Sequence, residues 1–495
     1  MKKTVKLLSL IMAMIVMLGT FGVVAFADGE ASTATITPDT SWYLKNSKTK
    51  TATLRDAADL AGLAKLVNDQ EEFFLDWTIK LGADIVYNEG KASDWAAGTS
   101  TPANVWTPIS DFFGTFDGQG YVISGLYFND MTASGVGLFA GLDGVTVKNV
   151  SIVNSYFAAG KQIGAIAGVS KGVSNTVSNC YSDAIIYADV SSNNGYLGGI
   201  LGRNMVSGTV VENCWFAGSV KAECDDNQNW ATKIGGIVGQ SEGDASSTIK
   251  NCLVTGKIEG QNQVGGILGV ANETGEAGSI VENCLMLGEI TVTRNNPSLF
   301  FGQFACVWKD GGKITLNKCY GLDTYTANVP GERFTGEKTK TIWNVNDTGV
   351  IVADTSVKVT SANITGDAAK TTLVGFDFDG VDTDGTEDIW LTVTDGTPVL
   401  KDLATIASTK ASGQAEAPVD PSELEVESDE QPGGDEQSGG DNENDETKAP
   451  ETDAPETEAP AEEKKGCGGT IAGMSVAAIA MIGAACGMIA KKKED

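Results

Sequence analysis

Three segments with almost the same sequence decide the fold: Leu197-Gly198-Gly199-Ile200-Leu201-Gly202, Ile234-Gly235-Gly236-Ile237-Val238-Gly239 and Val264-Gly265-Gly266-Ile267-Leu268-Gly269. Related copies begin at Val136, Ile163 and Phe300. A second motif lies between the copies, and its members are Asn149-Val150, Asn179-Cys180, Asn213-Cys214, Asn251-Cys252, Asn283-Cys284 and the shifted Asn317-Lys318-Cys319. The second motif recurs every 30 to 38 residues, a period that is typical of stacked repeats.

The sequence between these motifs predicts short strands. Each unit holds about three β-rich runs that are separated by Gly, Asn and Ser, with no helical periodicity. We therefore expect an all-β chain that forms a parallel β-helix, in which equivalent residues of successive coils lie about 4.8 Å apart. In that arrangement the glycines would let the wall bend, and Glu212, Lys250 and Glu282 would stack with alternating charge.

The two residue types of the second motif have separate expected roles. Stacked asparagines are expected to form a ladder of amide hydrogen bonds at a bend of the coil. Stacked cysteines are expected to be buried, reduced thiols, because in-register side chains point the wrong way for good disulfide torsion.

The first 130 residues precede the regular repeats. Residues 1–27 have a basic start, an apolar core and the small-residue site Ala25-Phe26-Ala27, which predicts a secretory signal peptide. Residues 28–130 are expected to form an N-terminal cap and the first coils. Within them, residues 54–70 predict a helix over the open end of the solenoid, with Thr53 and Asp56 in capping-box spacing.

Several motifs outside the repeats carry a family resemblance. They are Trp106-Thr-Pro-Ile, Gly114-Thr-Phe-Asp-Gly-Gln-Gly, Ile-Ser-Gly-Leu126 and the closing Gly375-Phe-Asp-Phe378. Together with the repeats at 131–320, they resemble bacterial cell-surface proteins that carry GLUG repeats. The resemblance implies a surface β-helix and no particular activity. Such repeats also accompany zinc metallopeptidases that cleave immunoglobulin A1, but the peptidase motif needs two histidines and this chain has none.

The rest of the chain predicts a surface anchor. Residues 321–410 are expected to hold the last coils and a C-terminal cap. Residues 411–465 are acidic and contain proline, with 19 acidic residues against one lysine up to residue 463, which predicts a disordered spacer. Residues 466–490 end in an apolar run of transmembrane length, and the basic residues 491–495 predict a cytoplasmic tail.

This layout predicts a single-pass protein of a Gram-positive-type envelope, with its N-terminal domain outside the cell. A Leu-Pro-x-Thr-Gly sorting motif is absent from the sequence. The segment Gly466-Cys467-Gly468 is either a processing or lipidation site or simply the edge of the helix.

The amino-acid composition excludes several kinds of catalytic and metal site. Without histidine the chain cannot build a Ser-His-Asp triad, a Cys-His pair or a histidine-ligated zinc site. The repeat carboxylates do not align in one column, and there are only four arginines. We therefore expect no catalytic residues, metal or cofactor. A net charge of −30 and a pI near 4.3 also argue against nucleic acid as a partner.

The sequence offers a ligand-binding candidate on its loops. Trp230, with Asp225 and Asp226 nearby, is the leading candidate, because an aromatic ring on a loop can stack on a sugar ring. Trp308 is a second aromatic candidate; both tryptophans could instead pack against the coils. Insertions between repeats tend to form a binding face, and here they fall at 170–175, 203–208, 240–247 and 270–279, with further loops near Asn193 and at 223–231.

The function expected from the sequence is adhesion, ligand binding or envelope structure by a monomeric, membrane-anchored surface solenoid. Its partner would be an extracellular glycan or a protein of a host or neighbouring cell. The alternative is a carbohydrate-active β-helix enzyme, either a polysaccharide lyase or a hydrolase.

Overall fold

The computed structural model describes residues 35–70, 72–190, 195–224, 232–244, 246–293, 300–308, 311–329, 337–344, 349–378, 389–394 and 396–401. The predicted signal peptide, acidic spacer, membrane span and basic tail lie outside these residues. Within the described part of the chain, no helix has the length and hydropathy needed to cross a membrane.

Each middle coil of the solenoid consists of five short strands. One coil contains β15 (Gly195–Gly198), β16 (Leu201–Asn204), β17 (Val210–Glu212), β18 (Trp215–Phe216) and β19 (Ser219–Glu223). The all-β parallel solenoid predicted from the repeats is confirmed. The number of strands per coil was wrong, because both sequence motifs contain corners: Gly199 and Ile200 separate β15 from β16, and Asn213 separates β17 from β18.

Sheet A has 17 strands in two rows, which pair in parallel from coil to coil apart from one antiparallel contact between β26 and β32. The first row is β7 (Phe139–Leu142), β11 (Ala167–Ser170), β16, β21 (Val238–Gly243), β26 (Leu268–Glu273), β31 (Ala305–Val307) and β34 (Ile342–Asn344). The second row is β1 (Thr51–Leu54), β2 (Thr78–Leu81), β4 (Thr115–Asp117), β8 (Thr146–Lys148), β12 (Thr176–Ser178), β17, β22 (Thr248–Lys250), β27 (Ser279–Glu282), β32 (Lys313–Asn317) and β35 (Val350–Asp354).

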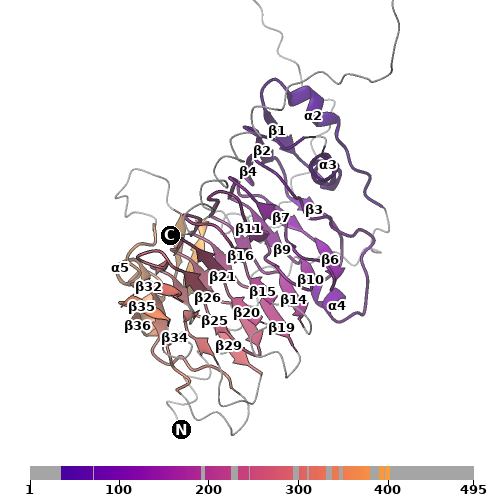
Figure 1. Cartoon of the computed structure of the whole chain (residues 1–495). Coiled ribbons are helices and arrows are strands. Elements are labelled where there is room, and N and C mark those ends of the chain that lie inside the picture. Colours follow the sequence, from indigo (N-terminus) through magenta and orange to yellow (C-terminus); the bar gives the residue numbers. More distant parts are fainter. Residues whose placement is uncertain are drawn as a thin grey trace, which may run out of the picture. The chain divides into compact units, whose positions relative to one another are not determined.

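Three smaller parallel sheets complete the coils. Sheet B is β3 (Ile85–Val86), β5 (Val122–Ser124), β9 (Ser151–Val153), β13 (Tyr181–Ser182), β18, β23 (Leu253–Val254), β28 (Leu285–Met286), β33 (Tyr320–Leu322) and β36 (Val357–Val359). Sheet C is β6 (Tyr127–Asp130), β10 (Tyr156–Ala159), β14 (Ile185–Asp189), β19, β24 (Lys257–Gly260) and β29 (Glu289–Val292). Sheet D is β15, β20 (Thr232–Gly235), β25 (Val264–Gly265) and β30 (Phe301–Gly302). Figure 1 shows strands of successive coils side by side along the solenoid.

Helices cover the first coil. The helices α2 (Ser41–Asn46) and α3 (Ala57–Asn68) lie near β1 and β2 (Figure 1). The predicted apolar face of α3 is buried through Leu60, Leu63, Leu66 and Val67. The predicted start was wrong: Thr53 belongs to β1, and α3 begins after Asp56, whose side chain accepts a hydrogen bond from the Asp59 N–H at 2.9 Å. A short helix, α4 (Ala92–Ala96), covers the outer face of sheet C through Trp95, which packs on Tyr127.

Inside the solenoid, residues of the same type stack on one another at equivalent positions of successive coils. The cysteines of the second motif are fully buried free thiols, as predicted; they are Cys180, Cys214, Cys252, Cys284 and Cys319. Burial raises the pKa of the first four of these thiols well above the ordinary value, so they stay protonated. On the outside of sheet A, Lys250 lies 2.8 Å from Glu212, which confirms one attraction of the predicted charge stack.

The asparagine ladder is present but interrupted. Nδ2 of Asn179 donates to Oδ1 of Asn149 at 3.0 Å, and Nδ2 of Asn283 donates to Oδ1 of Asn251 at 3.3 Å. Between these two pieces, Oδ1 of Asn213 has no hydrogen-bond partner among the described residues. All five asparagines have φ between 50° and 56°, a left-handed conformation that asparagine tolerates better than other side chains. The residue type is thus selected by the corner as well as by the ladder.

The ladder gives a test with a matched control. Asn251→Leu and Asn213→Leu place leucine at nearly the same φ, 53° and 51°, but only the first removes the acceptor of a ladder hydrogen bond. We expect Asn251→Leu to lower the free energy of unfolding by about 1 kcal/mol more than Asn213→Leu. Urea denaturation measures the difference, and equal losses would assign the asparagines to the corner alone.

The glycines of the Gly-Gly motif have a different role from the one predicted. Neither Gly199 nor Gly236 has a positive φ, so the bend alone does not demand glycine. Instead, a Cβ on Gly199 would lie 2.2 Å from the carbonyl oxygen of Gly236 and 2.3 Å from the Phe216 ring. Glycine therefore occupies this position because the coils pack closely on one another and on the interior side chains.

The last described residues return along the side of the solenoid. We call residues 360–378, 389–394 and 396–401 the C-terminal strap; it contains η2 (Ser361–Ile364), α5 (Ala368–Thr372), and the antiparallel pair β37 (Trp390–Val393) and β38 (Gly396–Leu400). Strap residues including Ile364, Leu373 and Trp390 form an apolar cluster with outward side chains of sheet B, which are Trp215, Leu253, Leu285 and Tyr320. This second core is separate from the interior of the coils.

Candidate functional site

Four successive coils form a groove at the corner between the two rows of sheet A. Its volume is about 630 Å³. The lining residues are Gly172, Val173, Ser174, Met205, Val206, Ser207, Glu242, Gly243, Asp244, Asn272 and Thr274. All of them come from the loops at 170–175, 203–208, 240–247 and 270–279 that the sequence marks as insertions. We call this feature the groove.

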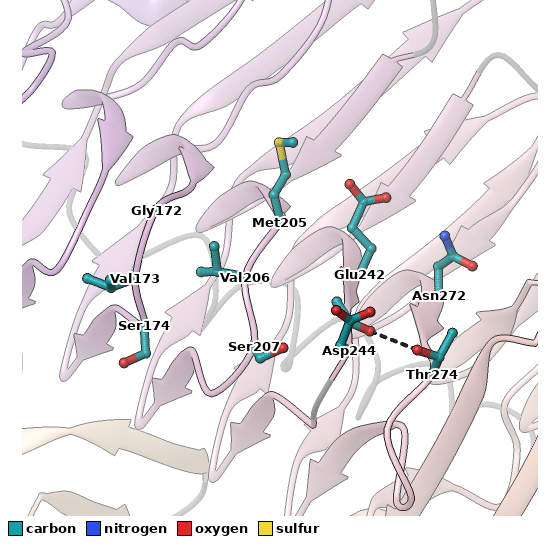
Figure 2. A pocket seen from close by; sticks show the side chains of 11 residues that line it. Gly172, Val173, Ser174, Met205, Val206, Ser207, Glu242, Asp244, Asn272 and Thr274 are labelled. Carbon is teal, nitrogen blue, oxygen red and sulfur yellow. Dashed lines mark hydrogen bonds between the residues drawn. The ribbon is translucent and has the colours of Figure 1, made fainter. Parts of the chain in front are cut away.

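Strand register places the lining side chains in rows along the solenoid axis. Glu242 pairs with Asn272 in the β21–β26 register, and Ser241 pairs with Asn204 in the coil before. Figure 2 shows Met205, Glu242 and Asn272 following one another across the coils, with Ser207, Asp244 and Thr274 in a second row. The Thr274 hydroxyl donates to the carbonyl oxygen of Gly243 at 3.3 Å, which ties neighbouring coils together at the groove.

A buried cluster beside the groove holds Glu242 in place. Nη2 of Arg203 lies 2.6 Å from Oε1 of Glu242, and Nε2 of Gln240 donates to Oε2 at 3.4 Å. The side chains of Arg203 and Glu242 are only 16% and 23% exposed. The Arg203 guanidinium lies over the Tyr196 ring, 4.3 Å from its centroid. Because both partners are largely shielded from water, this ion pair fixes the Glu242 side chain more firmly than a surface pair would.

Lys233 completes the cluster. Its ammonium lies 5.1 Å from the centroid of the Tyr196 ring and 5.8 Å from that of Trp308, within the range of cation–π attraction. Burial, together with the nearby charge of Arg203, lowers the pKa of Lys233 to about 8, and the carboxylate of Glu242 opposes this shift. Trp308 itself packs against Val270, Phe300 and Cys306. This packing is one of the two roles considered for Trp308 from the sequence, and the other, stacking on a sugar ring, stays a prediction.

A polar network around a buried carboxylate adjoins the lining residues Glu242, Asn272 and Thr274 in the sequence. Glu273 is completely buried, and it accepts hydrogen bonds from the Ser247 N–H at 2.8 Å and the Ser241 hydroxyl at 3.0 Å. Nδ2 of Asn204 lies 3.4 Å from the same carboxylate. Burial raises the pKa of Glu273, and the hydrogen bonds from Ser247 and Ser241 counteract that rise in part. The network links three coils and so keeps the groove loops in register.

The groove combines groups that suit hydroxyl-rich ligands. Glu242, Asp244 and Asn272 supply oxygen and amide groups, while Val173 and Met205 expose apolar surface, at 60% and 42%. Side chains of this kind hydrogen-bond to hydroxyls and pack against C–H groups. The described residues include no group of three or more Cys, Asp or Glu side chains that could hold a metal ion.

The insertion loops predicted from the sequence line the groove, but the three residues chosen as the ligand site cannot be compared with it. Trp230, Asp225 and Asp226 lie outside the described residues, so the structure does not place them. Glu223, the last residue of β19, pairs with Lys221 at 2.9 Å and accepts a hydrogen bond from Tyr187 at 3.1 Å.

Sequence reasoning missed Met205, Asn272 and the support of Glu242 by Arg203. The loop lengths carried the signal for this face. To select the individual groove residues, one must know which side chains point outward at the corner between the two rows of sheet A.

Comparisons with known proteins are limited. No family model matches the sequence. Over 191 residues, 38% of its length, the chain is 26% identical to halomucin of Haloquadratum walsbyi, and this match spans only 2% of halomucin. The chain is similar to a crystal structure of a Bacteroides ovatus protein provisionally described as an immunoglobulin A1 protease. That match has a TM-score of 0.47 and 19% identity, and it covers 71% of this chain and 92% of that one.

Proposed function

We propose that this chain is a membrane-anchored surface protein of the GLUG-repeat type that binds an extracellular glycan in the groove. The observation that carries the proposal is the groove itself, in which four coils present polar and apolar side chains in rows. The pre-set position of Glu242 supports binding, because a side chain that is already ordered loses less entropy when a ligand arrives.

Binding without turnover is part of the proposal. In the groove, Glu242 is engaged by the largely shielded guanidinium of Arg203, and histidine is absent from the sequence. Glycoside hydrolysis needs a pair of carboxyl groups that reach the bond to be cleaved, whereas both oxygens of Glu242 are already engaged, Oε1 by Arg203 and Oε2 by Gln240. The groove thus offers contacts for a sugar chain rather than an acid and a base for its cleavage.

The surface location rests on the two ends of the sequence. A signal peptide at residues 1–27 would export the chain, and the apolar run before the basic tail would retain it in the membrane. The acidic segment at residues 411–465 lies between the described residues and this apolar run in the sequence. A monomer that is exported and retained in this way would present its groove to glycans outside the cell.

The test uses the full-length chain on intact cells. Cells that express it should bind fluorescent polysaccharides selected on a glycan array, and external protease should abolish binding and leave a small membrane-embedded fragment. Ser174→Trp should weaken binding about tenfold or more by filling one end of the groove. Ser93→Trp, an equally exposed change on α4, should have no effect.

Two results would contradict the proposal. Equal binding by Ser174→Trp and Ser93→Trp would remove the groove from the function. New reducing ends or unsaturated sugars released from a bound polysaccharide would establish an enzyme instead, and their loss in an Asp225→Asn/Asp226→Asn variant would place the chemistry on that loop.

A further inference from the structure

We infer that the groove takes an uncharged, linear glycan that lies along the solenoid axis and contacts successive coils with successive sugar units. The inference rests on the proposed function and specifies the class of ligand. Three features carry it: the repeat of the groove positions, the charges at its edge and the change in polarity along its length.

The first feature is the repeat. Neighbouring coils lie about 4.8 Å apart, and the groove residues of consecutive coils are in register through the β16–β21 and β21–β26 pairs. The units of an extended β1→4-linked pyranose chain repeat at about the same distance. Such a chain can therefore place one sugar unit over each of Met205, Glu242 and Asn272 in turn (Figure 2). A branched or compact ligand would contact fewer coils.

The second feature is charge. The groove loops contain two cationic residues, and both are paired: Lys171 with Asp111 at 3.1 Å and Arg203 with Glu242 at 2.6 Å. Lys233, which also lies near Glu242, is only 4% exposed. Asp244 is exposed and adds a negative charge to the lining. Carboxylated or sulfated sugars would be repelled by these negative charges, whereas uncharged sugars would not. The charges therefore contribute to specificity for uncharged sugars more than to the affinity for them.

The third feature is the change in polarity along the groove. Val173 and Met205 provide exposed apolar surface on the first two coils, whereas Asp244, Asn272 and Thr274 provide polar groups on the next two. Apolar side chains suit the C–H faces of sugar rings, and carboxylate or amide groups suit their hydroxyls. The two ends of the groove thus differ, so a bound chain would have one preferred direction.

The experiment measures binding of full-length protein in detergent to oligosaccharides of two to six units by calorimetry. The uncharged probes are β1→4-linked glucose, xylose and N-acetylglucosamine oligomers, and the anionic probes are galacturonate oligomers. We expect the affinity for at least one uncharged series to rise up to about four units, one for each coil of the groove, and then to level off. Hexagalacturonate should bind about tenfold or more weakly than the best uncharged hexamer at low salt.

A charge reversal provides the internal control. Asp244→Lys should improve binding of hexagalacturonate about tenfold and weaken binding of the uncharged hexamer. Asp367→Lys makes the same change in net charge on the C-terminal strap, where the side chain is 93% exposed, and should alter neither.

The outcomes separate the inference from the function. If galacturonates bind as well as uncharged oligomers, if affinity does not depend on length, or if only branched glycans bind, the inference is wrong while glycan binding stands. If no glycan on the array or in these series binds, the proposed function is wrong as well.

Discussion

Replacing Gly199 with alanine is expected to lower the free energy of unfolding by about 3 kcal/mol or more. The new methyl group would lie 2.2 Å from the carbonyl oxygen of Gly236 in the next coil and 2.3 Å from the ring of Phe216. The first contact is with backbone, which cannot move without disturbing a whole coil. The second is with a fully buried ring in a packed interior. One added carbon should therefore disturb two adjacent coils.

Gly141→Ala is the matched control. The nearest atoms to its added methyl group are Cε of Lys171 at 3.2 Å and Cγ1 of Val169 at 3.4 Å, and both belong to side chains that can move. Neither Gly199 nor Gly141 has a positive φ, so the same substitution is compared in ordinary backbone. Thermal and urea denaturation of the two variants should differ by several degrees in Tm. Similar losses would show that the coils separate easily and that the glycines are not selected by packing.

The second large effect is expected at the C-terminal strap. Trp390 is completely buried, and its ring centroid lies 4.9 Å from that of Phe376 within the cluster on sheet B. Trp390→Ala should weaken docking of the strap by about 3–5 kcal/mol. Because the strap cluster is separate from the coil interior, we expect the strap to open while the coils remain folded.

Limited proteolysis distinguishes local opening from global unfolding. Trp390→Ala should speed cleavage within residues 360–401 many-fold and leave the fragment before residue 360 intact. Val374→Ala alters a strap side chain that is 53% exposed and should leave cleavage unchanged. Simultaneous loss of both regions would mean that the strap is needed for the coils to fold.

The repeated part of the fold was predictable because its physical cause is repeated in the sequence. A residue that suits the interior at Cys214 suits it again at Cys252, and the corner at Asn213 recurs at Asn251. Each copy of the repeat shows again which residue types a given position of the coil accepts. The cap helix was also predictable from its apolar face, although its start was placed too early because Thr53 imitates a capping residue.

Other features had no such repetition to reveal them. The interruption of the amide ladder at Asn213 depends on side-chain orientation, which nothing in the motif encodes. The strap has no period of its own, and its apolar residues Leu373 and Phe376 have meaning only beside the outward side chains of sheet B. For the candidate site, loop length indicated the face that carries the groove, whereas the pairing of Arg203 with Glu242 across coils required the corner geometry.

The strap also decides how the molecule would bear a mechanical load. A pull on Lys401 is transmitted first to β38 and β37, and from there through the apolar cluster of the strap to the side chains of Trp215, Leu253, Leu285 and Tyr320, each on a different coil. Tension would thus be shared sideways among several coils instead of unwinding the last one from its end. When the pull exceeds the strength of this lateral contact, the strap should peel away first, while the coils stay wound.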